Sequence, residues 1–235
     1  MRVCAIVVAG GSARRFGETG GKQLAPVAGG TVLGYTLRAF DRARTVDDIV
    51  VVCHPDRTAE YERLAVTPSV TGKPVVVVAG GETRQHSVHN GIDAAPSGCD
   101  VIVVHDGARP LVTPELIDGA VEALDAHPDV AGIVVGHPSY DTLKVVRDAR
   151  VVETPDRDAF WVAQTPQVFR ADVLRAAYLA ADAAGRTGTD DASVVEMAGH
   201  EVHMYEGPRD NIKVTVAGDI AFVQTVLELR GEAGP

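Results

Sequence analysis

The chain has 235 residues, 46% of them hydrophobic, and 22 basic against 32 acidic residues give a formal charge of −10. This length can bury one large core and the apolar fraction is typical of a globular α/β protein, so we expect a single domain over residues 1–235. The acidic balance excludes a broad nucleic-acid surface, and basic residues gathered in a few segments favour a local site for a small phosphorylated ligand.

The cysteines and the hydropathy pattern limit the kinds of site and the cellular location that we expect. Cys4, Cys53 and Cys99 are odd in number and lack C-x-x-C spacing, so neither a disulfide framework nor a thiolate metal site is indicated. Apolar runs stay well short of the ~20 residues that cross a bilayer, and Met1-Arg2 lead straight into such a run without a signal pattern. We expect a cytoplasmic protein without a membrane partner.

The first predicted element is a buried strand over Val3–Val8, which leads into a loop rich in small and basic residues. This first loop, residues 9–23, runs from Ala9-Gly10-Gly11-Ser12-Ala13-Arg14-Arg15 to Lys22-Gln23. Small residues let backbone N–H groups approach an anion, and the cations suit a polyphosphate. The spacing matches neither the Walker loop nor G-x-G-x-x-G, and an ordinary turn with a solvated arginine pair has the same pattern.

Further strands and helices alternate along the next hundred residues. Continuous apolar runs predict buried strands, and apolar stripes at helical spacing predict the helices between them. The strands are expected at Ile49–Cys53, Val75–Val78, Val101–His105 and Val130–Val135, and the stripes at Leu33, Leu37 and Phe40 and at Leu116, Ile117, Ala120, Val121 and Leu124. We expect Thr83 and Thr113 to cap helices.

This alternation predicts a doubly wound, mostly parallel Rossmann-like sheet. In such sheets ligands bind beyond the carboxyl ends of the strands. The first loop, Gly80-Gly81-Glu82 and His105-Asp106-Gly107 would all emerge there, so we expect these three loops to face one crevice.

The alternation of strands and helices is interrupted at residues 137–155, where Leu143–Val146 and Val151–Glu153 flank the turn-like Arg147-Asp148-Ala149-Arg150. This pattern predicts a protruding β-hairpin, which we call the arm. An excursion with so little core must pack on something, either a second subunit or its own domain. A helix through Val173, Leu174, Ala177 and Tyr178, a strand at Val202–Tyr205 and a last helix from about Thr215 complete the prediction.

Several distant motifs, taken together, resemble the 2-C-methyl-D-erythritol 4-phosphate cytidylyltransferases of the non-mevalonate isoprenoid pathway. The resemblance spans essentially the whole chain and is most specific where three motifs occur in order. They are His105-Asp106-Gly107-Ala108-Arg109-Pro110, Gln164-Thr165-Pro166-Gln167 and Asn211-Ile212-Lys213-Val214-Thr215; the first loop, Gly80–Val88, Asp141–Lys144, Pro155–Asp158 and Thr189-Asp190-Asp191-Ala192-Ser193 extend the match.

The resemblance implies a homodimeric, Mg²⁺-dependent transfer of CMP from CTP to 2-C-methyl-D-erythritol 4-phosphate, with release of pyrophosphate. It implies that Mg²⁺ is held mainly by the CTP phosphates, and we assign no protein ligand to the metal. By motif position the catalytic residues are Arg15, Lys22, Lys213 and Arg157. The CTP-binding residues are Ala9, Gly10, Gly11, Ser12, Gly81, Glu82, Ser87 and Asp106, with Arg84 in the same segment.

The implied acceptor site comprises Asp106, Arg109, Thr142, Arg157 and Thr165, and the resemblance places Thr142 and Arg157 in the arm region of the neighbouring subunit. From the residues alone, Thr142 is equally an ordinary strand residue, Arg157 a surface partner of a neighbouring aspartate, and Ser87 a polar helix residue. Ala13 departs from the family pattern, which usually has a glycine there.

Three other functions remain open from the sequence. A relative that makes CDP-ribitol from ribitol 5-phosphate would share the nucleotide loop and Lys213, although Ala108 in place of the valine more typical of those enzymes favours methylerythritol. A nucleotide-binding regulator without turnover is a second alternative, against which the retained cations count. An NAD-dependent dehydrogenase is disfavoured because Cys53-His54-Pro55 follows the second strand where an acidic ribose ligand is expected.

Overall fold

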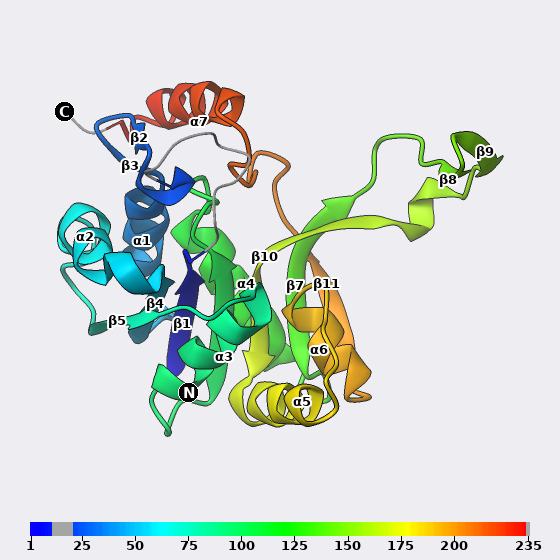
Figure 1. Ribbon diagram of the computed structural model, residues 1–235, viewed down its shortest axis with the longest axis horizontal. Coiled ribbons are helices and arrows are strands. Elements are labelled where there is room, and N and C mark those ends of the chain that lie inside the picture. The colour runs from blue at the N-terminus through cyan, green and yellow to red at the C-terminus, as the bar shows by residue number, and fades with distance from the viewer. Residues whose placement is uncertain (11–20, 234–235) are drawn as a thin grey trace.

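Seven strands form one central sheet in the structure, a computed structural model that describes residues 1–10 and 21–233 (Figure 1). The strand order is β11-β7-β10-β6-β1-β4-β5. The strands are β1 (Val3–Val8), β4 (Asp48–Cys53), β5 (Val75–Ala79), β6 (Val101–Asp106), β7 (Gly132–Pro138), β10 (Trp161–Arg170) and β11 (Val202–Glu206).

The predicted doubly wound, mostly parallel sheet is confirmed. β1 pairs in parallel with β4 and β6, β4 with β5, and β7 with β11, whereas β10 runs antiparallel between β6 and β7. The chain proceeds outward from β1 to β4 and β5 and then returns to the other side of β1 with β6. The carboxyl ends of β1 and β6 therefore meet at the point where the strand order reverses, which is where ligands bind in open α/β sheets.

Helices cover both faces of this sheet because the strands bury both sets of alternating side chains. Val3, Ala5 and Val7 face one core, and Cys4 and Ile6 face the other. The first core includes side chains of α1 (Val32–Arg42) and α4 (Pro114–Ala126); the second includes side chains of α3 (Arg84–Ala94), α5 (Ala171–Ala183) and α6 (Asp191–Met197).

Smaller elements complete the described chain. A third apolar cluster joins α7 (Gly218–Leu229) to the short strand β2 (Pro26–Val27) and the start of α1. The remaining short elements are β3 (Gly30–Thr31), α2 (Thr58–Tyr61), a π-helical turn at Glu62–Val66, and 3₁₀ turns at Lys22–Leu24, Pro55–Arg57 and Arg157–Ala159.

The predicted helix caps are confirmed. Thr83 Oγ1 accepts from the His86 N–H at the start of α3, and Thr113 Oγ1 accepts from the Leu116 N–H at the start of α4. Pro114 occupies the first turn of α4, as predicted. Both signals are local, so they survive without knowledge of the fold.

Outside the arm, two predicted starts were wrong by two or more residues. β7 begins at Gly132 rather than Val130, because the Val130 N–H closes a turn onto the His127 carbonyl after α4. α7 begins at Gly218 rather than near Thr215, because the Asp219 carboxylate accepts from the N–H groups of Thr215 and Val216 and holds that segment in a turn.

The arm is a hairpin that projects away from the sheet (Figure 1). Its strands are β8 (Val145–Arg147) and β9 (Arg150–Glu153), shorter than predicted, since Leu143 and Lys144 lie outside them. Asp148 and Ala149 connect the strands with φ of 49° and 62°, the two positive values typical of a tight type I′ hairpin turn. β7 and β10 extend together toward the arm and form its base.

Candidate active site

The carboxyl ends of four strands surround a cavity of about 670 Å³. Val8 ends β1 and Gly10 follows it, His54 and Pro55 follow β4, and Asp106 ends β6 with Ala108 after it. The remaining lining residues come from the first loop, the β5–α3 segment and the segment before α7: Lys22, Gln23, Gly80, Gly81, Glu82, Thr83, Arg84, Ser87, Lys213 and Thr215. The predicted convergence of three loops on one crevice is confirmed.

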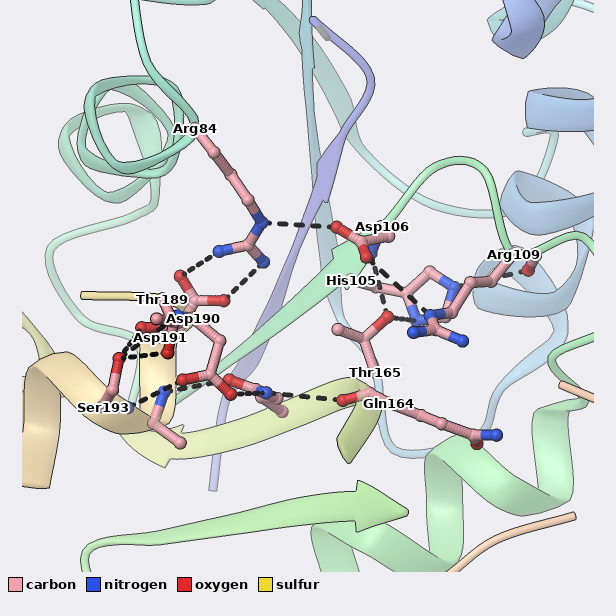
Figure 2. Close-up of polar contacts among 12 residues, drawn as sticks. Arg84, His105, Asp106, Arg109, Gln164, Thr165, Thr189, Asp190, Asp191 and Ser193 are labelled. Atoms are coloured by element: carbon pink, nitrogen blue, oxygen red, sulfur yellow. Dashed lines mark hydrogen bonds and ion pairs between the residues drawn. The ribbon is translucent and has the colours of Figure 1, made fainter. Parts of the chain in front are cut away.

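Asp106, the last residue of β6, is the centre of a charged cluster at this cavity (Figure 2). Its Oδ2 lies 2.8 Å from Lys213 Nζ and 3.8 Å from Arg109 Nε, and its Oδ1 lies 3.4 Å from Arg84 Nε. Burial alone would raise the pKa of Asp106, but the Arg84 and Lys213 cations outweigh it and hold the pKa well below its ordinary value. The carboxylate is therefore ionised throughout the physiological range.

Arg84 joins this carboxylate to a second one. Its Nη1 and Nη2 donate to Oδ1 and Oδ2 of Asp191 at 3.1 and 2.7 Å, while its Nε faces Asp106. Burial would lower the pKa of Arg84, but Asp191 and then Asp106 raise it above its ordinary value. The guanidinium is thus a permanent cation spanning two acids from α6 and β6.

Thr165 supports Asp106 through the backbone. The Asp106 N–H donates to Thr165 Oγ1 at 3.0 Å, and His105 Nδ1 lies 3.1 Å from the same oxygen. Burial lowers the pKa of His105 to about 3, so the ring is neutral and the Thr165 hydroxyl can donate to Nδ1. Since both interactions use the hydroxyl, Thr165 fixes the position of the β6 end.

Lys213 reaches the cavity because the segment around it is bound to two neighbouring loops. The Val214 N–H donates to the Ala108 carbonyl, and the buried Asn211 amide donates to the Thr165 carbonyl and to Gln164 Oε1. Arg109 Nη1 in turn donates to the Asn211 carbonyl at 2.7 Å. Residues more than a hundred positions apart are thereby held in one network.

The opposite wall of the cavity is formed by the β5–α3 segment, which places backbone close to the ligand space. The Gly81 N–H donates to Ser87 Oγ at 3.1 Å, and the Ser87 hydroxyl donates to the Thr83 carbonyl at 2.9 Å. A Cβ on Gly80 would lie 2.9 Å from Ser87 Oγ, so the loop requires glycine for close packing. Glu82 is exposed at the rim of this wall.

The site residues predicted from the sequence fall into four groups. Gly10, Lys22, Gly81, Glu82, Ser87, Asp106 and Lys213 line the cavity; Arg109, Thr165 and the buried Ala9 lie directly behind it, Ala9 accepting from the Tyr61 hydroxyl. Thr142 and Arg157 lie in or next to the arm and do not line this cavity, and Arg157 donates to the Tyr140 carbonyl. Gly11, Ser12 and Arg15 lie outside the described residues.

Sequence reasoning missed the roles of Asp191 and Tyr178. The Thr189-Asp190-Asp191 motif was noticed but had no assigned contact, and a lone tyrosine in a helical stripe reads as core. Asp191 is fully buried and accepts from the Tyr178 hydroxyl at 2.5 Å. Nothing in the local pattern relates either residue to Arg84, about a hundred positions earlier.

Within residues 1–10 and 21–233, three or more His, Cys, Asp or Glu side chains do not come together in a metal-binding group. Likewise, none of the helices there is long and apolar enough to cross a membrane.

Comparison with known proteins bears on the chemistry of this site. The family model for 2-C-methyl-D-erythritol 4-phosphate cytidylyltransferase matches residues 3–229. Enzymes of that name from Caldanaerobacter subterraneus and Geotalea uraniireducens are 38% and 40% identical to the chain over 228 and 231 residues. Those alignments cover 97% of this chain in each case and 99% and 97% of the relatives.

Solved structures show the same likeness in three dimensions. The 4-diphosphocytidyl-2C-methyl-D-erythritol synthase of Anaerococcus prevotii superposes with a TM-score of 0.84 at 28% identity, covering 97% of this chain and 98% of its own. The 2-C-methyl-D-erythritol 4-phosphate cytidylyltransferase of Thermus thermophilus gives a TM-score of 0.78, also at 28% identity, covering 97% and 100%. The chain belongs to the 2-C-methyl-D-erythritol 4-phosphate cytidylyltransferase family.

Proposed function

We propose that the cavity binds CTP beside 2-C-methyl-D-erythritol 4-phosphate and that the chain transfers CMP between them. The products are 4-diphosphocytidyl-2-C-methyl-D-erythritol and pyrophosphate. The observation that carries this proposal is the position of Lys213, which lies 2.8 Å from Asp106 and lines the same cavity as the glycine-rich β5–α3 segment. Cations and backbone donors thus face one space large enough for a nucleotide.

The reaction forms a bond between an acceptor phosphate oxygen and the α-phosphorus of CTP and breaks the bond from that phosphorus to the β-phosphate bridging oxygen. The nucleophile is already an anion, so the site needs no general base. His105 fits this requirement, since it is fully buried, neutral and bound to Thr165. The work of the protein is to align two repelling phosphates and stabilise charge on the pentavalent transition state.

We assign that electrostatic work to four cations. Lys22 lines the cavity near the triphosphate end of the site, and Arg15 belongs to the same first loop by sequence. Lys213 approaches from the opposite end of the chain, and Arg157 completes the set from an arm. Each places fixed positive charge where negative charge develops.

Cytosine recognition is assigned to the wall of Gly80–Ser87. The Ser87 hydroxyl, held between Gly81 and Thr83, orders the backbone groups that read the edge of the base. By motif position, Ala9, Gly10, Gly11 and Ser12 are assigned to the nucleotide as well, and of these Gly10 lines the cavity together with Glu82.

The residues of the cavity suit Mg²⁺ that arrives with the nucleotide. Asp106 is the single buried carboxylate among the described lining residues, and its oxygens are already engaged by Lys213 and Arg84. That donor set fits an ion that would be held chiefly by phosphate oxygens. Bound there, Mg²⁺ would neutralise triphosphate charge and favour departure of pyrophosphate.

The acceptor is assigned to Asp106, Arg109 and Thr165 together with Thr142 on the arm and Arg157 just after it, both from a second subunit, with the Asp106 carboxylate facing polyol hydroxyls and the guanidinium groups facing the phosphate. Several observations support a homodimer through the arm: Val151 and Val152 on the hairpin are 60% and 54% exposed, and Trp161 and Val162 at its base are also exposed. Arg157 and Thr142 do not line the cavity of their own chain. On this proposal the chain is one nucleotidyltransferase domain, 1–235, whose arm completes the site of a neighbour.

The test is pyrophosphate release with CTP and Mg²⁺. Turnover is expected with 2-C-methyl-D-erythritol 4-phosphate and to be much slower with ribitol 5-phosphate or with ATP, GTP or UTP. Preference for ribitol 5-phosphate would contradict the acceptor assignment, and binding of CTP without turnover on either acceptor would contradict the enzyme assignment.

A further inference from the structure

Asp191 combines complete burial with a direct link to the charged cluster of the cavity. It is the first residue of α6, is fully buried and does not line the cavity. Its carboxylate accepts from both terminal nitrogens of Arg84, at 3.1 and 2.7 Å, and from the Tyr178 hydroxyl at 2.5 Å. A substrate in the cavity therefore cannot touch Asp191, but it lies next to a residue that Asp191 holds.

The fork of Arg84 points to Asp191 and leaves a single nitrogen, Nε, toward Asp106 (Figure 2). A guanidinium binds a carboxylate best through two parallel N–H groups. Asp191 occupies that preferred geometry, so Asp106 receives only the weaker 3.4 Å contact from Arg84. The division of the guanidinium between two acids is thus unequal.

This inequality keeps Asp106 available to Lys213. Oδ2 of Asp106 lies 2.8 Å from Lys213 Nζ, while the Arg84 contact falls on Oδ1. If the fork of Arg84 were released from Asp191, its nearest acid would be Asp106, and a bidentate pair there would compete with Lys213 for the same carboxylate.

We infer that Asp191 is a positioning residue for nucleotidyl transfer: by holding the fork of Arg84, assisted by Tyr178, it keeps Asp106 paired with Lys213 and so fixes the lysine beside the reacting phosphates. The inference rests on the proposed function for the catalytic part of its effect. It assigns a task to the Thr189-Asp190-Asp191 motif, which the mechanism otherwise leaves unused.

The kinetic test compares Asp191→Asn in two backgrounds. In the otherwise native chain we expect kcat to fall about 10-fold with KM for CTP within about 2-fold, because a neutral amide holds the fork less strongly. In an Arg84→Met background the same substitution should leave kcat unchanged, because there is no fork to hold. It should also raise Tm there, since an unpaired buried carboxylate is removed.

These outcomes separate positioning from a merely structural role. An equal fold loss of kcat in both backgrounds, or a kcat that follows Tm across the four proteins, would overturn the inference. Tyr178→Phe, which keeps the core shape, should lower kcat about 2-fold to 5-fold in the same sense. Asp182→Asn is the matched control on α5, where the carboxylate pairs with His89 and Gln85 away from Arg84, and it should leave kcat unchanged.

A second readout does not depend on turnover. Acetylation of Lys213 by an N-hydroxysuccinimide ester, followed by mass spectrometry, reports whether the ammonium is paired. We expect severalfold faster labelling of Lys213 in Asp191→Asn than in the native protein, with Lys144 on the arm unchanged as an internal reference. Unchanged labelling of Lys213 in Asp191→Asn would overturn the inference. If the wild type showed no turnover while Lys213 labelling still became faster in Asp191→Asn, the proposed function alone would be overturned.

Discussion

The cavity edge of the sheet and the arm differ in how much of their environment the chain itself supplies. At the cavity edge, Asp106 contacts Lys213, Arg84, Arg109 and Thr165, contributed by segments spread over a hundred residues of sequence. On the arm, the strands β8 and β9 are exposed along their whole length. The side chains at the cavity edge find their partners within a single chain, whereas the arm strands stay exposed.

This difference separates the proposed site residues that one chain positions by itself from those that need a second surface. The nucleotide-facing residues are fixed by contacts that exist before any ligand binds, so their geometry is preorganised. Thr142 and Arg157 acquire a role only if another surface meets them. Four experiments test whether the two regions differ in this way.

Lys213→Ala tests the preorganised edge. We expect a loss of ~10²-fold or more in kcat, because removal of one donor to a transition-state charge typically has that effect. The fold should be unaffected, since Lys213 is 40% exposed and Asp106 keeps Arg84 and Arg109. Steady-state kinetics measure kcat, and circular dichroism reports the fold. Lys144→Ala is the matched lysine control. A kcat near that of the wild type for Lys213→Ala would contradict the assigned role.

A mixture of inactive variants tests whether the arm completes a neighbouring site. Arg157→Ala alone should lose ~10-fold to 10²-fold in kcat with unchanged Tm, as its exposed side chain contacts the Tyr140 carbonyl and the neighbouring Asp158 among the described residues. Refolded together with Lys213→Ala, half of the dimers would be mixed and each would hold one intact site. Activity should then recover to about a quarter of wild type.

No recovery on mixing, with mixed dimers verified by tagged purification, would place Arg157 and Lys213 in the same chain's site. Full activity of Arg157→Ala by itself would remove the residue from the mechanism.

The pH dependence of stability tests the buried base of the cavity edge. Burial lowers the pKa of His105 from 6.5 to about 3 in the folded chain, so the unfolded chain binds the proton more readily. The contribution of neutral His105 to the stability of the folded chain is therefore complete above pH 6.5, and it is lost progressively as pH falls toward 3. Between pH 7.5 and pH 5 His105 should contribute a loss of about 2 kcal/mol in the free energy of unfolding.

Urea unfolding of the wild type and His105→Gln at the two pH values measures this contribution. His105→Gln should have a lower free energy of unfolding at pH 7.5, because it loses the packing of the ring against Phe40. Its free energy of unfolding should change less between the two pH values than that of the wild type. Equal pH slopes for the two proteins would show that His105 is not the group responsible.

The smallest effect is expected at the arm turn. Ala149 has φ of 62°, a conformation that costs an L-residue about 1–2 kcal/mol and glycine little, so Ala149→Gly should stabilise the hairpin by ~1 kcal/mol. Slower amide hydrogen exchange in β9 would report it, with kcat unchanged. Asp148→Asn, a residue type equally tolerant of positive φ, is the control, and faster exchange in Ala149→Gly would contradict the turn assignment.

Much of the fold could be predicted because its signals are local. The apolar runs of β1, β4, β5 and β6 and the threonine caps of α3 and α4 require no knowledge of distant contacts. β10 was missed because Gln164, Thr165 and Gln167 interrupt its apolar pattern. Those polar side chains are tolerated in a buried strand because each finds a partner from another element.

The site divides in the same way. The resemblance placed residues such as Asp106 and Lys213 correctly at one cavity, since shared motifs carry positions with them. It could not indicate that both terminal nitrogens of Arg84 bind Asp191, because that pair spans 107 positions and depends on how α3 and α6 are placed around the same core. Side-chain partners of this kind are set by tertiary packing, which periodicity does not report.

The path of β10 has a consequence for how such a protein can diverge. The strand packs Thr165 against Asp106 and, a few residues earlier, pairs with β7 at the base of the arm through Trp161 and Val162. Substitutions on the exposed arm disturb few contacts within the chain, whereas changes at Thr165 reach the buried end of β6. If the arm completes a neighbour's acceptor site, as proposed, selection for a new acceptor would act most readily on the arm, where the risk to folding is small.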